Sequence, residues 1–305
     1  MTPVEWLWIP VTLWAAFAQT LRNAAQRHLT KELGTLGATL VRFLYGLPFA
    51  AAWLGGVKAF GGWEIPASDL AFFLWVTFGA VSQIAATALL LRTMQERNFT
   101  LGVAYSKTEI VQVAVFGLVV LGDPITATAA FAVACGTAGV LLLSPADRQR
   151  PFASLAAGLR SRSALLGLGS GAGFAFSVIG YRAAALSLGE VPFLMAAAWT
   201  LLVAQAIQTV LLGGWLLARD PDVVLRVLRA WRASLFAGFM GAAASVGWFT
   251  AFTLTTAAYV RTLGLIELVF AMIVSRRLFS ERLAPIEYAG VALLTLGLVA
   301  ITLWR

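Results

Sequence analysis

The chain of 305 residues is 60% hydrophobic and only 12% charged, a balance that excludes a soluble globular domain, in which about 45–50% and about 25% are usual. A net charge of +8 would suggest a nucleic-acid partner in a soluble protein, whereas basic loops that face anionic lipid explain it in a membrane protein. One cysteine (Cys135) and one histidine (His28) exclude an intrachain disulfide and a Cys/His metal site. Because no GKS/T loop, HExxH or GxSxG motif occurs, we expect no cofactor and no enzymatic activity.

Ten apolar runs follow one another along the chain, each near the ~20 residues that a helix needs to cross the hydrocarbon core. In chain order they are residues 4–22, 35–57, 69–91, 99–121, 126–144, 163–186, 190–216, 233–255, 258–279 and 284–304. The runs are continuous and do not alternate as barrel strands do, so the sequence predicts ten transmembrane helices. The N-terminal stretch MTPVEWLWIP lacks the basic region of a signal peptide, so we expect the first run to be retained.

The loops between these runs alternate in charge. Basic residues are concentrated in the odd-numbered loops, at Arg27, Lys31, Arg97, Arg148, Arg150, Arg160, Arg162, Arg219, Arg226, Arg229, Arg232, Arg276, Arg277 and Arg282. The even-numbered loops hold Lys58 and little else. By the positive-inside rule the odd-numbered loops are cytoplasmic. The charges therefore predict a multi-pass protein of a bacterial-type inner membrane, with both termini extracytoplasmic.

A basic loop that contains two prolines divides the chain into two halves. We predict a first five-helix repeat at residues 1–145, a basic linker loop at 146–162 and a second five-helix repeat at 163–305. Five is an odd number, so the second half must be inverted relative to the first. Inverted repeats are typical of secondary transporters, in which the substrate site lies between the halves near the midplane.

Similar sequences in the two halves support this division. The block that begins at Glu109 aligns without a gap with the block that begins at Glu267. Just upstream, AYSKT (104–108) aligns with AYVRT (258–262) if four residues, about one helical turn, are inserted in the second half. The first helices of the halves match more weakly and pair Arg22 with Arg182. The basic loops flank opposite ends of the two halves, as inversion requires.

Four charged side chains fall inside predicted helices. Lys107 and Glu109 lie in the first half of the fourth helix, Arg261 near the start of the ninth, and Glu267 near the middle of the ninth. A charge at mid-membrane costs about 2.5–3.5 kcal/mol on insertion scales, so each of the four must face a partner or water. Residues two apart on a helix diverge by about 200°, which predicts that Lys107 and Glu109 do not pair with each other.

Each charge is therefore expected to meet the other half of the protein or a ligand. The pairs would be Lys107 with Glu267 and Arg261 with Glu109, and in one interpretation they lock or gate a cavity. In another interpretation, Lys107 and Arg261 receive an anionic group of the substrate. A role of Glu109 or Glu267 in taking up and releasing a proton is compatible with both interpretations.

Uncharged polar and aromatic residues extend the candidate site. We add Tyr105, Tyr259, Gln19 and Gln83 to the candidate substrate-binding residues, because they carry hydrogen-bonding groups within or at the ends of the helices. The aromatic residues Trp248, Phe249 and Phe252 either form walls of a cavity or face lipid. Arg22 and Arg92 lie near helix ends, where a long side chain can extend its charge to the membrane interface.

These features resemble the drug/metabolite transporter superfamily and, within it, the ten-helix EamA-type proteins. The segments 108–143 and 265–300 resemble two copies of its pattern, in which a Leu-Glu-Pro element precedes a Gly-Glu-Arg turn and a glycine-rich helix. TLVRFLYGLP (39–48) is similar to the Arg-Phe segment of the family's second helix, whereas Ile110 and Leu268 replace the prolines that usually follow the glutamates. The resemblance implies helices one to four and six to nine around a central cavity, with five and ten outside it.

We therefore predict an all-α integral membrane protein that is a secondary active transporter of a small polar metabolite, working by alternating access. Its candidate cations, which are Lys107, Arg261, Arg22, Arg42 and Arg182, outnumber Glu109 and Glu267. This excess favours an anionic or zwitterionic substrate, such as an amino acid or organic anion. The alternative is a proton-coupled exporter of cationic or hydrophobic drug-like compounds that uses the two glutamates. Expected partners are the small-molecule substrate, protons or a counter-substrate, and membrane lipids, but no nucleic acid; the sequence leaves monomer and homodimer open.

Overall fold

The computed structural model describes residues 6–96, 106–107, 109–122, 125–142, 162–279, 289–290, 292–293, 296–297 and 300. Its helices are α2 (Trp8–Leu44), α3 (Leu47–Gly61), α4 (Leu70–Glu96), α6 (Glu109–Phe116), the π-helix η1 (Gly117–Leu121), α7 (Ala127–Leu142), α9 (Arg162–Ser187), α10 (Phe193–Arg219), α11 (Pro221–Arg229), α12 (Trp231–Leu254), α13 (Ala257–Leu263) and α14 (Ile266–Phe279). Within these ranges the chain forms no strand, so the prediction of an all-helical protein is confirmed.

Four described helical segments are long and apolar enough to cross a membrane by themselves. They are Trp8–Gly61, Leu70–Gln95, Phe193–Arg219 and Trp231–Leu254. The first is long enough to contain two of the predicted spans. Two shorter apolar helices, Glu109–Leu121 and Ala127–Gly139, correspond to parts of the predicted fourth and fifth spans. The protein is therefore a multi-pass helical membrane protein.

Helix α2 joins the first two predicted spans across a bend at Gly34. That residue has φ 69° and ψ 177°, a conformation that other residues rarely adopt. The expected first loop, with Arg27 and Lys31, is therefore a continuation of the first helix. The prediction placed the helix end too early, because no glycine or proline interrupts the chain between Leu21 and Gly34.

Two further departures from the predicted spans occur in the second half. The loop predicted after the seventh span contains the short helix α11, which begins with Asp220 as a capping residue and Pro221 at its first position. An aspartate followed by a proline is a standard signal for the start of a helix, and the prediction of a loop overlooked it. The ninth span is broken, because α13 ends at Leu263 and α14 starts at Ile266.

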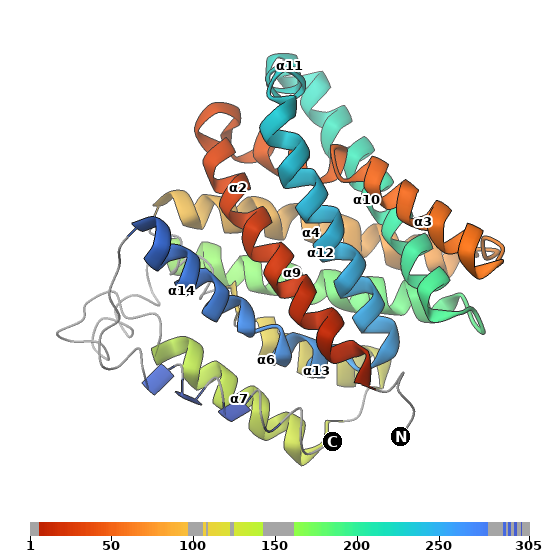
Figure 1. Ribbon diagram of the computed structural model, residues 1–305, viewed down its shortest axis with the longest axis vertical. Helices are drawn as coiled ribbons and strands as arrows, with labels where there is room; N and C mark the ends of the chain where they lie inside the picture. The colour runs from red at the N-terminus through yellow and green to blue at the C-terminus, as the bar shows by residue number, and fades with distance from the viewer. Residues whose placement is uncertain are drawn as a thin grey trace.

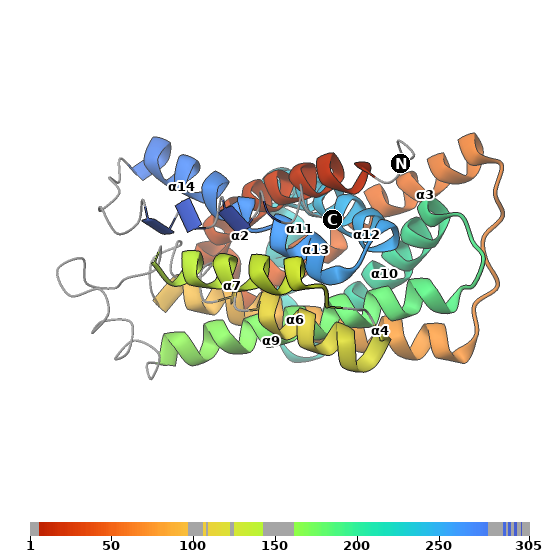
Figure 2. The same cartoon turned by 90° about the horizontal axis from the view of Figure 1, so that it is seen from below.

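The helices form two layers (Figure 1). Helices α2 and α12 lie side by side in one layer and α4 and α9 in the other, as Figure 2 shows from below. These are the two most extensive helix–helix contacts of the described structure. Small residues allow the close approach: a Cβ on Gly247 of α12 would lie 2.7 Å from the Cβ of Ala15 on α2.

Helices of the fifth and tenth spans pack against each other away from this centre. A Cβ on Gly297 would lie 3.0 Å from the backbone oxygen of Ala132 and 3.2 Å from the Cβ of Cys135, both on α7. The described residues at 289–300 are helical. The described residues of these two segments do not line the pocket, which agrees with the peripheral position that the family resemblance implied.

The α4–α9 contact gives a direct test of this packing. A Cβ on Gly180 would lie 2.9 Å from backbone atoms of Gly79 and 3.0 Å from the backbone oxygen of Trp75. We expect Gly180→Ala to lower the free energy of unfolding by about 1–3 kcal/mol, because backbone atoms cannot move aside locally. Gly214→Ala is the matched control, since its Cβ would meet nothing within 4 Å. Denaturant unfolding in detergent would contradict the packing if the two variants were equally stable.

Candidate functional site

A polar pocket lies between the two layers. Seven helices contribute to its wall, and most of its polar side chains are buried. The lining residues are Gln19, Arg22, Asn23 and Arg42 from α2; Gln83 and Leu90 from α4; Ser106, Lys107 and Glu109 at the start of α6; Phe174, Ser177, Val178 and Tyr181 from α9; Ser245, Trp248, Phe249 and Phe252 from α12; Arg261 from α13; and Glu267 from α14.

The two glutamates occupy equivalent positions at the starts of helices. Glu109 is in the first turn of α6, and Glu267 is in the first turn of α14, directly after the break at Gly264 and Leu265. The unpaired N–H groups of a helix N-terminus carry a partial positive charge that stabilises a carboxylate there. The break before α14 therefore occurs without the proline of the family pattern, and the starts of α6 and α14 each place a carboxylate in the pocket.

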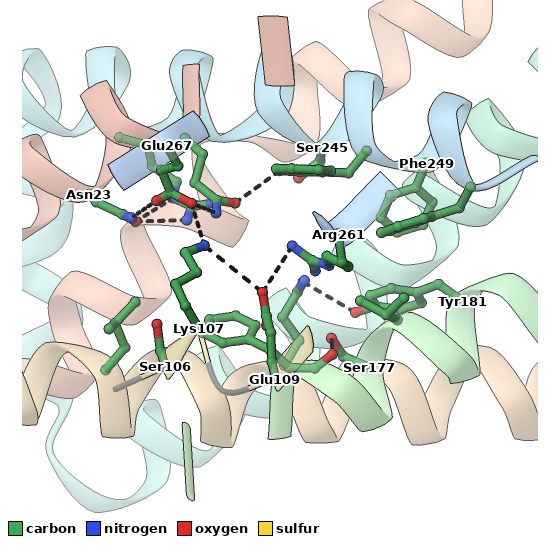
Figure 3. Close-up of a pocket in the computed structure, with 18 of the residues that line it drawn as sticks. Asn23, Ser106, Lys107, Glu109, Ser177, Tyr181, Ser245, Phe249, Arg261 and Glu267 are labelled. Atoms are coloured by element: carbon green, nitrogen blue, oxygen red, sulfur yellow. Dashed lines mark hydrogen bonds and ion pairs between the residues drawn. The ribbon is translucent and has the colours of Figure 1, made fainter. Parts of the chain in front are cut away.

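Glu267 is held by three donors. Its Oε2 accepts hydrogen bonds from Lys107 Nζ at 2.5 Å and Gln19 Nε2 at 2.7 Å, and its Oε1 accepts one from Asn23 Nδ2 at 2.9 Å. Gln19 is itself oriented by Trp248, whose Nε1 donates to Gln19 Oε1 at 2.9 Å. Glu267 is only 1% exposed, so this network replaces the water that the carboxylate loses on burial. Figure 3 shows Lys107, Asn23 and Glu267 converging from three segments.

Glu109 is held less closely than Glu267. Its Oε1 lies 3.5 Å from Arg261 Nη1 and 3.9 Å from Lys107 Nζ. Both predicted pairs between the halves, Lys107–Glu267 and Arg261–Glu109, are thus present (Figure 3). The prediction that Lys107 and Glu109 do not pair was wrong. Lys107 precedes α6, so the angle between residues of a regular helix does not apply to it.

Aromatic rings surround the Arg261 guanidinium. The Cζ atom of Arg261 lies 4.7 Å from the centroid of the Trp248 ring and 5.3 Å from the centroid of the Phe252 ring, distances typical of cation–π contacts. Phe249, the third aromatic residue considered in the sequence, also lines the pocket. All three rings are buried, so they form walls of the cavity and do not face lipid.

A second polar group lies on the α9 side of the pocket. Gln208 of α10 donates from Nε2 to Gln83 Oε1 and to the Tyr181 hydroxyl, each at 2.8 Å. The Tyr181 hydroxyl in turn donates to Gln83 Oε1 at 3.2 Å. These uncharged side chains join α4, α9 and α10, and present amide and hydroxyl groups to the cavity.

Two arginines on α2 complete the pocket. Arg22 is 1% exposed and Arg42 is 2% exposed. The expectation that Arg22 extends to the membrane interface was wrong, because α2 continues past the predicted span end and places Arg22 well inside the helix. Arg92 of α4, for which the same role was expected, is exposed. Arg182 lies outside the lining and donates to the backbone oxygens of Phe252 and Thr255 at the end of α12.

The structure brings most of the candidate site residues together. Six of the eight line the pocket: Lys107, Arg261, Gln19, Gln83, Glu109 and Glu267. Tyr259 does not, since its hydroxyl is 2.9 Å from the Thr126 hydroxyl and its ring packs edge-on against Trp8. Tyr105 lies outside the described residues. Among those residues, no group of three or more His, Cys, Asp or Glu side chains could hold a metal ion.

Sequence reasoning missed several lining residues, including Ser177 and Tyr181. One signal was present in α12, where Ser245, Trp248, Phe249 and Phe252 recur at the spacing of one helix face. Such a face is equally typical of packing between apolar helices, so the spacing alone does not identify a cavity. The serines gave no signal, because single serines are common where transmembrane helices pack.

Comparison with known proteins agrees with this architecture. A solved crystal structure aligns with 96% of the chain over 96% of its own length, with a TM-score of 0.67 and 14% sequence identity, which shows that the two share a fold. No curated protein sequence matches the chain. Residues 161–303, which contain α9 to α14, match the EamA-like transporter family. Residues 161–303 therefore form an EamA-like transporter domain, and this match supports membership of the chain in the drug/metabolite transporter superfamily.

Proposed function

We propose that the protein is a secondary active transporter of a small anionic or zwitterionic metabolite and that the central pocket is its substrate site. One observation carries this proposal. The described pocket is lined by four cations, Arg22, Arg42, Lys107 and Arg261, but by only two carboxylates, so its net charge is +2. A buried charge excess is costly in a low-dielectric environment, and an anionic substrate would relieve it.

We further propose that the chain forms ten transmembrane helices in two inverted repeats. The α2–α12 contact joins the first and eighth spans, and the α4–α9 contact joins the third and sixth. These contacts are equivalent if the halves are exchanged. The α6–α9 contact joins the fourth and sixth spans, and the α14–α2 contact joins the ninth and first, so these two contacts are also equivalent if the halves are exchanged. Glu109 and Glu267, which align in sequence, each lie in the first turn of a helix, as equivalent residues of two repeats should.

The cross-half ion pairs fit a cycle of alternating access. Lys107 and Glu109 belong to the first half, whereas Arg261 and Glu267 belong to the second, and the two pairs connect the halves at the pocket. If the halves rock about the substrate site, these pairs must lengthen or exchange partners. We propose that substrate binding and the rearrangement of these pairs are coupled.

The loop charges favour an orientation with both termini outside the cytoplasm of a bacterial-type inner membrane. Arg219, Arg226, Arg229 and Arg232 flank or lie in α11, which would be on the cytoplasmic side. A C-terminal reporter that is active only outside the cytoplasm should therefore be active. An inactive reporter, with a cytoplasmic one active in its place, would reverse the orientation.

Transport by purified protein tests the proposed substrate class. Proteoliposomes should take up radiolabelled succinate, glutamate or phosphate faster than empty liposomes, and the unlabelled compound should compete. Tetraphenylphosphonium is the probe for the alternative, an exporter of hydrophobic cations. That alternative receives no support from the pocket, because each glutamate already contacts a cation. Transport of the cation, together with no anion uptake by correctly folded protein, would refute the proposed function.

A further inference from the structure

We propose that Arg22 and Arg42 form the subsite that binds an oxyanion group, a carboxylate or phosphate, of the transported molecule. This inference rests on the proposed function and assigns its anion-binding role to particular atoms. It also gives Lys107 and Arg261, the cations that sequence reasoning selected for substrate binding, a different role. They would hold the two halves together through Glu267 and Glu109.

Arg22 and Arg42 each have a buried N–H donor that no described residue accepts. Arg22 Nε and Nη2 donate to Asn23 Oδ1 at 3.2 and 2.7 Å, and Arg42 Nη1 donates to the Thr87 hydroxyl at 3.1 Å. Both acceptors are uncharged. Arg22 Nη1 and Arg42 Nε are buried and have no hydrogen-bond partner among the described residues. Arginine cannot neutralise itself by losing its proton, so these donors require an acceptor from elsewhere.

The other two cations of the pocket are each paired with a carboxylate. Lys107 is paired with Glu267, and Arg261 is paired with Glu109. These two pairs cancel the charges of all four residues. Within the described structure, no carboxylate lies within ion-pair distance of Arg22 or Arg42. The net charge of +2 in the pocket therefore resides on these two guanidinium groups.

The side chains of Arg22 and Arg42 lie next to the same glycine of α12. Arg22 and Arg42 lie on opposite sides of the Gly34 bend, yet their stems meet at Gly241 of α12. A Cβ on Gly241 would lie 3.3 Å from Arg42 Cγ and 3.4 Å from Arg22 Cδ. The glycine thus leaves room for two adjacent guanidinium groups at the pocket wall. Planar guanidinium forks match the oxygens of carboxylates and phosphates, which can accept two parallel hydrogen bonds.

Binding to full-length protein in detergent tests the subsite separately from transport. Isothermal titration at constant ionic strength would use succinate and inorganic phosphate as probes and succinamide as the uncharged control. Either anion, but not succinamide, should bind the wild-type protein. We expect Arg22→Gln and Arg42→Gln each to weaken that binding about 10- to 100-fold, the usual effect of losing charge-assisted hydrogen bonds. Arg92→Gln, which changes an exposed arginine outside the pocket, should leave the affinity unchanged.

A second pair of variants separates binding from folding. Arg22→Lys and Arg42→Lys keep the charge but lose the planar fork, so they should fold normally and still weaken binding. Without ligand, the thermal unfolding midpoint of the glutamine variants should equal or exceed that of the wild type, because an unpaired buried charge is removed. A structural role for the arginines predicts a lower midpoint instead.

Three outcomes would overturn the inference. Wild-type affinity in both glutamine variants, with loss of binding in Lys107→Gln and Arg261→Gln, would move the anion to the ion-pair residues and leave the proposed function intact. Equal binding of succinamide would show that charge is not recognised. No binding of either anion, together with binding of tetraphenylphosphonium, would overturn the inference and the proposed substrate class together.

Discussion

Glu267→Ala is expected to lower the free energy of unfolding by about 3–5 kcal/mol, the usual cost of removing one partner from a buried ion pair. Three donors, Lys107, Gln19 and Asn23, lose their shared acceptor in this variant. Lys107 would keep only the longer contact with Glu109, at 3.9 Å. The pocket would then hold four cations against one carboxylate, which raises the cost further.

Denaturant unfolding in detergent measures this effect, with Glu64→Ala in the exposed loop before α4 as the matched control. The double variant Lys107→Met, Glu267→Met removes both charges and should be more stable than Glu267→Ala. A double-mutant cycle of the two positions should give a coupling energy of about 0.5–3 kcal/mol. Equal stability of Glu267→Ala and Glu64→Ala would show that the three-donor network contributes nothing to folding.

Lys107→Ala and Arg261→Ala are each expected to reduce the maximal rate of anion transport at least tenfold. Each removes one of the two ion pairs that connect the halves and leaves a buried glutamate with fewer partners. Because the oxyanion subsite is assigned to Arg22 and Arg42, the half-saturating substrate concentration should change less than the rate. The arginine variants should show the reverse pattern, a weaker affinity with a smaller change in maximal rate.

Uptake in proteoliposomes, measured over a range of substrate concentrations, separates these two patterns. Gly214→Ala is a suitable control, since it changes an exposed position where an added Cβ meets nothing within 4 Å. Lys107→Arg should recover part of the rate, because it restores a cation opposite Glu267. Full transport by both Lys107→Ala and Arg261→Ala would show that the ion pairs only support the fold.

The two glutamates differ in a way that bears on coupling. Glu267 accepts three hydrogen bonds, whereas among the described residues Glu109 has only the longer contacts of 3.5 and 3.9 Å with Arg261 and Lys107. A group that changes partners during transport must be released from its present ones at low cost. We therefore propose Glu109 rather than Glu267 for the gating role, for which the sequence named both.

Much of the candidate site could be predicted because charged residues inside apolar helices are so costly. Lys107, Glu109, Arg261 and Glu267 stand out in the sequence for this reason alone, and all four line the pocket. The cost of a buried charge also requires a partner, and we expected that partner to be in the other half of the protein or on a ligand. The helix positions followed from the same argument, since about 20 continuous apolar residues have few uses other than crossing a membrane.

Other features depended on contacts that no local pattern encodes. The break between α13 and α14 places Glu267 at a helix start without a proline, and the position of Lys107 before α6 permits its contact with Glu109. The sequence likewise left Arg22 open between the membrane interface and the cavity, because the predicted apolar run ends at this residue although α2 continues past it. Tyr259 appeared suitable for the pocket, but the structure directs its hydroxyl to Thr126.

The sequence by itself determined a membrane-spanning helical protein with buried charges, because hydrophobicity and the cost of intramembrane charge are local properties of the chain. Only the tertiary structure decided which cations are neutralised. That depends on distances between residues far apart in sequence, such as Lys107 and Glu267 or Arg261 and Glu109. The same distances leave the Arg22 and Arg42 guanidinium groups without a carboxylate partner in the described structure, which is why we propose that an anion binds there.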